Sequence, residues 1–271
     1  MIGASRQALD ELRERFDAQE SAASAQELTA LAADLRSCVH LLDREPALRR
    51  ALGDPSQSAE RKDALVRGLL RDKIGEPALE MLATGVGRRW SRPTDLADAI
   101  EQLAVVAEAG VAEKNGELDA LEDELFRFGR IVDGQTELLA ALGDPTAPQE
   151  SKSRLLADLL EGRTTPVTLR LITDLVLYPR GRSLERGLDS VAKYVAQRRR
   201  RLVALVRSAV NLTDRQCERL STALGEVYGH EIHLNIEIDP DVIGGLSVQV
   251  GDEVIDGTVA GRLEEVRWRL A

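Results

Sequence analysis

Aromatic residues and cysteines are scarce in this sequence, and long apolar runs are missing. Phe, Trp and Tyr make up 3% of the 271 residues, so aliphatic side chains must fill the core, which favours close-packed helices over a large ligand pocket. Cys38 and Cys217 form no CxxC pair, which leaves no disulfide framework and fits a reducing, cytosolic compartment. No run of about 18 apolar residues is present, and the charged N-terminus does not resemble a signal peptide. We therefore expect no direct membrane insertion.

The charge balance is acidic, with a net charge of −10 at pH 7. A protein that binds a phosphate backbone needs a basic surface. One basic run, Arg198 to Arg201, could indicate nucleic acid or anionic lipid. Arginines between apolar helix positions are more often a solvated face or a patch for an acidic protein partner. We therefore expect no nucleic acid among the partners.

Motifs for catalysis and cofactor binding are also missing. The sequence has no GxxxxGKS/T, GxGxxG, HExxH or GxSxG motif. His230 and His233 would point to opposite faces at the start of a strand, which is a poor arrangement for one metal ion. Asp252, Glu253 and Asp256 lack the ligand spacing of an EF-hand and fit turns beside glycines better. We expect no catalytic residue, no cofactor and no bound metal.

A short segment, ALGDP, occurs twice, at Ala51–Pro55 and Ala141–Pro145, ninety positions apart. At the same spacing Lys62 corresponds to Lys152, and paired leucines follow in both copies. Around each copy, apolar residues recur every three or four positions, which is typical of amphipathic helices. We interpret this as an internal duplication of one helical unit. The alternative is two unrelated helix-turn-helix segments that match by chance.

The last part of the chain has a different pattern. Thr213 and Gln216 have capping-box spacing before an amphipathic helix. Apolar residues alternate strictly with polar ones over 232–238 and again over 246–250, as in strands with one buried face. Apolar positions over 259–270 predict a final helix.

These patterns predict a mainly α fold, in which a duplicated N-terminal helical bundle is followed by a small C-terminal α/β domain. The first helical repeat is predicted over 1–93 and the second over 94–200. The α/β domain is predicted over 201–271.

The segment from Ile238 to Leu270, IDPDVIGGLSVQVGDEVIDGTVAGRLEEVRWRL, resembles the C-terminal motif of the δ-subunit family of F-type ATP synthases. The mitochondrial counterpart in this family is the oligomycin-sensitivity-conferring protein (OSCP). The preceding VALVRSAVNLTDRQCERLSTALGEVYG resembles the same family, and the second helical repeat does so more loosely. Thr258 stands where the family has serine, and the first repeat is an extra unit, as in long δ subunits. The resemblance implies a structural or stalk-contact role for Asp239, Pro240, Gly244, Gly245, Gly251, Asp252, Asp256, Gly257 and Thr258.

The resemblance implies a non-catalytic stator subunit that links the catalytic α/β head to the b-subunit stalk, so that proton-driven rotation is coupled to ATP synthesis. The implied partners are the N-terminal helices of the α subunits, held by the helical bundle, and the b subunits, met by the C-terminal domain. The implied location is peripheral, at the cytoplasmic face of the bacterial cell membrane. We expect the second repeat to keep a groove for an α-subunit helix, while the first adds a contact along the stalk. The candidate groove residues are Leu103, Val106, Leu169, Ile172 and Val176.

Two other interpretations stay open on the sequence alone. The chain could be a helical adaptor or regulatory protein unrelated to ATP synthase, with a fortuitous C-terminal match. It could also be an enzyme that uses the acidic turn residues Asp252 and Asp256.

Overall fold

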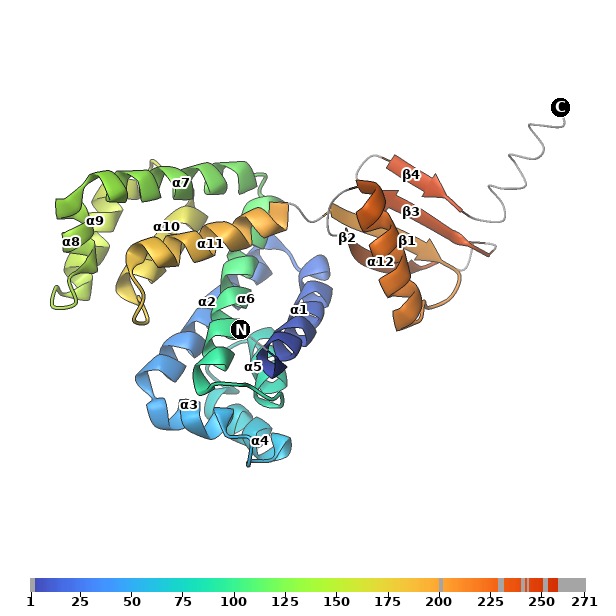
Figure 1. Cartoon of the computed structure of the whole chain (residues 1–271), viewed down its shortest axis with the longest axis horizontal. Helices are drawn as coiled ribbons and strands as arrows, with labels where there is room; N and C mark the ends of the chain where they lie inside the picture. The colour runs from blue at the N-terminus through green and yellow to red at the C-terminus, as the bar shows by residue number, and fades with distance from the viewer. Residues whose placement is uncertain are drawn as a thin grey trace. The chain divides into compact units, whose positions relative to one another are not determined.

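The computed structural model describes residues 3–199, 202–228, 232–239, 242, 244–250 and 253–257. The chain forms two compact units, Met1–Ala196 and Gln197–Ala271 (Figure 1). The first predicted repeat, and the second up to residue 196, therefore lie within one compact unit. The predicted start of the α/β domain at residue 201 is close to the boundary between the units.

The first unit is entirely helical within the described residues. Its helices are α1 (Ala4–Ala22), α2 (Ala25–Arg44), α3 (Pro46–Gly53), α4 (Ala59–Leu70), α5 (Glu76–Val86), α6 (Pro93–Lys114), α7 (Leu118–Gly134), α8 (Thr136–Gly143), α9 (Gln149–Leu160), α10 (Pro166–Leu177) and α11 (Leu184–Arg199). The mainly α prediction is thus confirmed.

The order of helix lengths repeats along the chain. Helices α2–α6, the first helix set, contain 20, 8, 12, 11 and 22 residues. Helices α7–α11, the second helix set, contain 17, 8, 12, 12 and 16 residues. Helix α6 contacts α1, α2 and α3, which precede it in the chain, and also α7 and α10 of the second helix set. The two sets therefore share α6 as a common packing partner.

The turn after the second helix of each set has the same geometry. The Asp54 carboxylate accepts a hydrogen bond from the backbone N–H of Ser56 at 2.8 Å, and Asp144 accepts one from the backbone N–H of Thr146 at 2.8 Å. Hydrogen bonds from the backbone and side chain of Ser56 lower the pKa of Asp54. Hydrogen bonds from the side chain and backbone of Thr146 lower the pKa of Asp144. The repeated ALGDP segment therefore ends in a repeated Asx turn.

A carboxylate from the first helix of each set caps a later helix. Asp34 on α2 accepts from the N–H of Gly75, the N-cap of α5, at 2.8 Å. Glu124 on α7 accepts from the N–H of Thr165, the N-cap of α10, at 3.0 Å. Both bonds join residues 41 positions apart. The N–H groups at the start of a helix have no partners within the helix. In each set, a carboxylate from a helix distant in sequence accepts a hydrogen bond at this position.

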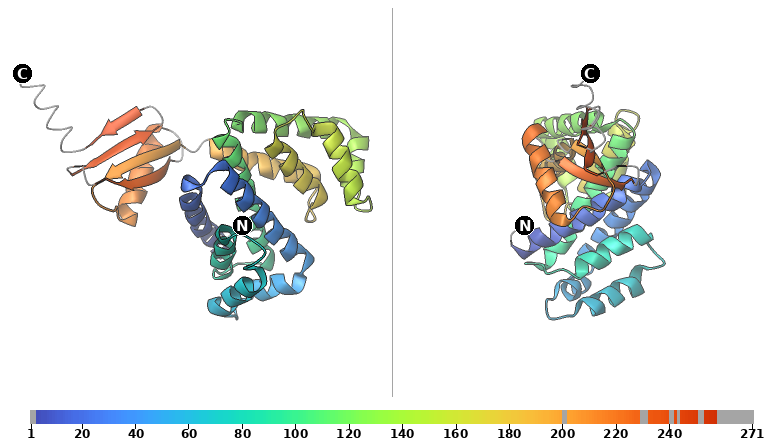
Figure 2. Two further views of the ribbon diagram at one scale, coloured as in Figure 1. Left: turned by 180° about the vertical axis from the view of Figure 1, so that it is seen from behind. Right: turned by 90° about the vertical axis from the view of Figure 1, so that its right-hand side faces the viewer.

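Helix α6 forms the centre of the first unit because most of its surface is apolar and small. Alanines and Gly110 recur along its buried positions, and small side chains allow a neighbouring helix to approach closely. Helices α2 and α6 lie side by side over much of their length (Figures 1 and 2). Leu28, Leu35 and Leu42 of α2 are fully or almost fully buried in this core.

The second unit is a four-stranded mixed sheet with one described helix, α12 (Asp214–Tyr228). The strand order is β2-β1-β3-β4, in which β1 (Leu202–Ser208) pairs parallel with β2 (Ile232–Ile238) and antiparallel with β3 (Leu246–Val250). Strand β4 (Glu253–Asp256) pairs antiparallel with β3. The strands predicted over 232–238 and 246–250 are confirmed, and β1 is a strand that the sequence analysis did not assign. The helix predicted over 259–270 lies outside the described residues.

Asp95 ties α1 to the start of α6. Its side chain is 1% exposed, and its carboxylate accepts hydrogen bonds from Ser5 Oγ at 2.7 Å and from Arg92 Nη2 at 2.7 Å. Burial alone would raise the pKa of Asp95, but the hydrogen bonds from Arg92 and Ser5 outweigh burial and lower it. The charged form therefore stabilises the folded state.

We expect this carboxylate to contribute to acid sensitivity. Because its folded pKa is lowered, its contribution is fully present above the unfolded value of about 3.9 and is lost as the pH falls through the folded pKa. The Asp95→Asn variant should lose about 1–3 kcal/mol of unfolding free energy at neutral pH, since hydrogen bonds to a charged group are weakened. Urea denaturation should show this deficit shrinking as the pH is lowered from about 6 to about 3.

The exposed Asp72→Asn variant serves as the control and should follow the unchanged protein at every pH. A deficit in Asp95→Asn that stays constant over the whole acid range would contradict the assigned ionisation.

Candidate functional site

A buried carboxylate lies where the two helix sets meet. Glu108 on α6 is 0% exposed. Its carboxylate oxygens lie 2.9 Å from Arg36 Nη1 of α2 and 2.6 Å from Arg170 Nη2 of α10. Arg170 also donates from Nε at 2.9 Å, so its guanidinium group binds the carboxylate with two nitrogens. The hydrogen bond to Glu108 raises the pKa of Arg170. One carboxylate is thus held by one arginine from each helix set.

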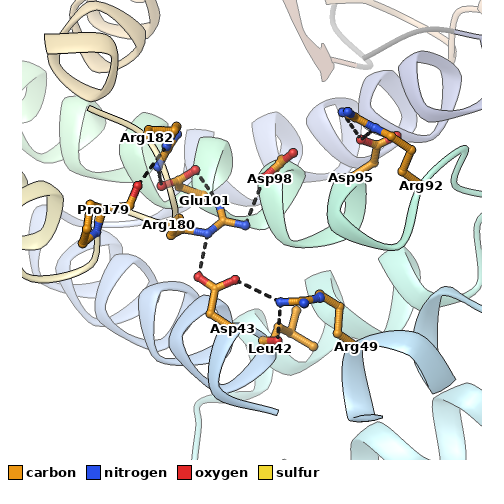
Figure 3. A network of polar contacts seen from close by, with 10 residues as sticks. All are labelled: Leu42, Asp43, Arg49, Arg92, Asp95, Asp98, Glu101, Pro179, Arg180 and Arg182. Carbon is orange, nitrogen blue, oxygen red and sulfur yellow. Dashed lines mark hydrogen bonds and ion pairs between the residues drawn. The ribbon is translucent and has the colours of Figure 1, made fainter. Parts of the chain in front are cut away.

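A second group of ion pairs, around Arg180, also joins the two helix sets (Figure 3). Arg180, in the loop between α10 and α11, has a side chain that is 8% exposed. Its nitrogens lie 2.6 Å from Asp43 of α2, 3.0 Å from Asp98 of α6 and 2.6 Å from Glu101 of α6. Glu101 also pairs with Arg182. Loop residues of the second set are therefore fastened to two helices of the first.

The backbone and the ionisation of Arg180 both reflect these contacts. Arg180 has a φ of 51° although it is not glycine, a conformation that needs support from the surrounding structure. Burial alone would lower the pKa of its guanidinium group, but the carboxylates of Glu101, Asp43 and Asp98 outweigh burial and raise it. Arg180 is therefore a fixed cation at the junction.

Aromatic stacking adds a third contact between the same elements. The rings of His40 on α2 and Tyr178 after α10 are stacked, with centroids 3.5 Å apart and an interplanar angle of 23°. His40 Nε2 lies 2.9 Å from Asp174 Oδ1. The Arg44 guanidinium carbon lies 5.9 Å from the centroid of the Tyr178 ring. We call these three groups of contacts, around Glu108, Arg180 and His40, the junction.

The junction can hold the two helix sets in a fixed relative position. Its charges are paired with one another, and paired buried charges fix relative position more than they add stability. Within the described ranges, no group of three or more His, Cys, Asp or Glu side chains could hold a metal ion. An open cleft beside the junction is lined by Asp43, Arg49, Arg92, Thr94, Asp98, Tyr178, Arg180 and Arg182.

The candidate groove residues lie on α6 and α10, which are in contact. Leu103, Ile172 and Val176 are buried in the core of the first unit. Val106 and Leu169 are half-buried and pack against that core. Only these last two present part of their side chains at the surface, so they are the positions where a partner could touch the proposed groove. The groove itself stays a prediction.

The first part of the C-terminal motif forms the connection from β2 to β3. The backbone N–H of Asp239 donates to the carbonyl oxygen of Ser208 at 2.9 Å. Gly244 and Gly245 have φ values of 67° and 84°, which glycine adopts without the steric cost that a side chain brings. The two glycines therefore allow the chain to turn into β3.

The second part of the motif follows β4. Asp256 pairs with Ser247 in the sheet, and the Gly257 N–H donates to the Leu246 carbonyl oxygen at 2.8 Å. A Cβ atom at Gly257 would lie 3.0 Å from that oxygen, so a side chain there would force the backbone to move. Outside the described residues lie Pro240, Gly251, Asp252 and Thr258 of the motif, and also Arg200, Arg201 and His230.

The residues of the junction were not among those predicted from the sequence. Glu108 did carry a signal, because it is the only charged residue in the apolar stretch Ala104–Ala112 of α6, and a charge in such a stretch must find partners. Arg180 carried no comparable signal, since it follows Pro179 in an ordinary loop sequence.

The family of the chain follows from comparison with known proteins. A family model described as "ATP synthase delta (OSCP) subunit" matches residues 104–270, more than half of the chain. The chain belongs to the ATP synthase delta (OSCP) family. As a member of this family it is a non-catalytic, structural component of the peripheral stalk of F-type ATP synthase. This excludes the unrelated adaptor and the enzyme as alternatives.

Individual members of the delta family match over the full length. The "ATP synthase subunit delta" of Streptomyces avermitilis is 51% identical over 269 residues, covering 99% of this chain and 98% of that protein. That of Streptomyces griseus is 51% identical, and that of Thermobifida fusca 49% identical, each covering 100% of both chains. The family match begins inside α6, so helices α1–α5 form an extra unit that these long relatives share.

We expect Glu108→Ala to destabilise the first unit by about 3–5 kcal/mol, because it leaves two arginines facing each other without their counter-ion. The exposed Glu14→Ala variant should change the free energy of unfolding by less than about 0.5 kcal/mol. Chemical denaturation followed by far-ultraviolet circular dichroism measures both. Equal stability of the two variants would show that the buried carboxylate does not hold the helix sets together.

Proposed function

We propose that this delta-family protein ties the catalytic α/β head to the b-subunit stalk, so that the head does not turn with the rotor and proton flow is coupled to ATP synthesis. In this proposal the helical unit binds N-terminal helices of the α subunits, and the C-terminal unit meets the b subunits. The observation that carries the proposal is the junction, which fastens two helix sets into one body within a full-length member of the family.

Resistance to rotation requires stiffness in the part that carries the torque. The first unit supports this requirement because its two helix sets share α6 and are linked by buried ion pairs. Buried ion pairs have a strict geometry, since displacement of either partner leaves an uncompensated charge. Several helix-sized contacts on one stiff body also add their affinities through avidity.

The surface for the α-subunit helix is proposed at the α6–α10 side of the second helix set, around Val106 and Leu169. Both side chains are half-buried, so an apolar helix face that docks there would complete their burial. The extra helices α1–α5 are proposed to add a contact along the stalk.

The proposed location is peripheral, at the cytoplasmic face of the bacterial cell membrane. The family and its bacterial members support an association with the membrane through the ATP synthase complex. None of the helices in the described part of the chain is long and apolar enough to cross a membrane.

We expect Leu169→Glu to weaken binding of the full chain to the α/β head by about tenfold or more, because a partner helix would have to desolvate the new charge. Titration calorimetry with the purified head measures the affinity, and circular dichroism checks that the variant is folded. Leu65→Glu, at an exposed leucine of α4, is the matched control and should bind within about twofold of the unchanged chain. A folded Leu169→Glu chain with full affinity would contradict the proposed site.

A further inference from the structure

One face of α2 is covered by the second helix set. Its side chains recur at the spacing of a single helix face, and each contacts α10, the loop after α10, or the carboxylate that α10 shares. These residues are Arg36, His40, Asp43 and Arg44. Of the residues that cover them, Asp174 meets His40, Tyr178 stacks on His40, and Arg180 pairs with Asp43.

Helix α7 is the equivalent of α2 in the second helix set. The register is fixed by two features, because Glu124 caps α10 as Asp34 caps α5, and Val132 is buried as Leu42 is. Both pairs are separated by ninety positions. The residues of α7 that correspond to the covered face of α2 are Phe126, Arg130, Asp133 and Gly134.

This face of α7, which we call the α7 face, is not covered by another element in the described part of the chain. All of its residues are exposed, and Phe126 is 68% exposed. The other two phenylalanines, Phe16 and Phe128, are both buried. Among the described residues, Arg130 forms no ion pair. In repeat architectures each unit buries one face against the next unit. The last unit has no next unit, so the equivalent face of that unit stays exposed.

We propose that the α7 face binds the C-terminal end of an amphipathic helix from another subunit of the complex, in the manner in which α10 and its following loop bind α2. The internal interface defines the chemistry of this partner. Where Asp174 meets His40, the partner has a carboxylate that pairs with Arg130. About one turn before that carboxylate, where α10 has Arg170 beside the Glu108 that Arg36 also binds, it has an aromatic or apolar residue that packs against Phe126. Where Arg180 pairs with Asp43, it has a basic residue that pairs with Asp133.

The equivalent segment of a second copy, α5 and the loop after it, does not provide that chemistry. In the first helix set, the residue that corresponds to Asp174 is Thr84, which has no carboxylate for Arg130. Near the positions that correspond to Tyr178 and Arg180, Arg88 already pairs with Glu11 at 2.8 Å, and Trp90 is buried. The partner is therefore a different subunit. This inference rests on the proposed function, because that function places such subunits next to the chain.

The test uses the full chain in the assembled complex. A photo-crosslinking phenylalanine analogue at position 126 should capture one helical peptide of another subunit, with an acidic residue within about one turn of an aromatic or apolar one. Capture of this chain alone, or of no protein, would overturn the proposal.

Two surface variants measure the contribution of the contact. Phe126→Ser and Arg130→Glu should each weaken binding of the full chain to the captured subunit by about tenfold or more, while Arg130→Lys keeps most of the affinity. The control variant Arg154→Glu on α9 also changes an exposed residue, and it should bind within about twofold of the unchanged chain.

Both variants alter exposed side chains and should unfold at the same temperature as the unchanged chain. If Phe126→Ser and Arg130→Glu bind with full affinity, the α7 face is not an interface, and the proposed function stands because the chain still assembles. If the unchanged chain itself binds neither the head nor the stalk, the proposed function and this inference are both wrong.

Discussion

The main constraint on this structure is that the buried carboxylate of Glu108 has no contact with solvent. Glu108 lies within α6, whose side chains are mostly buried, and its charge is acceptable there only because Arg36 and Arg170 bind it. One arginine comes from each helix set, so the carboxylate is satisfied only when the sets hold one particular relation. Hydrophobic packing between helices tolerates small sliding motions, whereas a buried ion pair loses its compensation as the partners separate.

The remaining features of the first unit extend this constraint. The shared helix α6 gives both sets a common surface, and Arg180 fastens the loop after α10 to α2 and α6 at a distance from Glu108. Two separated fastenings resist rotation better than one, because a single contact can act as a pivot. A peripheral-stalk subunit must transmit a sustained twisting force without deforming, so this construction suits the family to which the chain belongs. The C-terminal unit contributes a separate surface, built on a sheet whose turns depend on Gly244, Gly245 and Gly257.

The sequence predicted features that depend on local pattern. The duplication was visible because the turn at Asp54 and its copy at Asp144 need the same residues at the same spacing. Strands β2 and β3 were visible because their apolar residues alternate. Strand β1 was not predicted because its residues directly follow the basic run Arg198 to Arg201, and the pattern there is also typical of a helix that continues. The C-terminal motif identified the family, although part of it lies outside the described residues.

The junction could not be predicted because its partners are remote in sequence. Arg180 and Asp43 are 137 positions apart, and His40 and Asp174 are 134 positions apart. Periodicity indicates which face of a helix is buried, but it does not tell which charged residue on another helix will face it. The duplication also misleads here, because equivalent positions of the two sets have different surroundings. His40 is covered, while its counterpart Arg130 is exposed.

The central claim is that the two helix sets move as one rigid body. Spin labels at the equivalent exposed positions Ala64 and Arg154, in a chain with Cys38→Ala and Cys217→Ser, would report the distance between the sets by pulsed electron paramagnetic resonance. The account predicts one narrow distance distribution, which broadens when Arg180→Ala removes the second fastening. A broad or multiple distribution with the junction intact would contradict it.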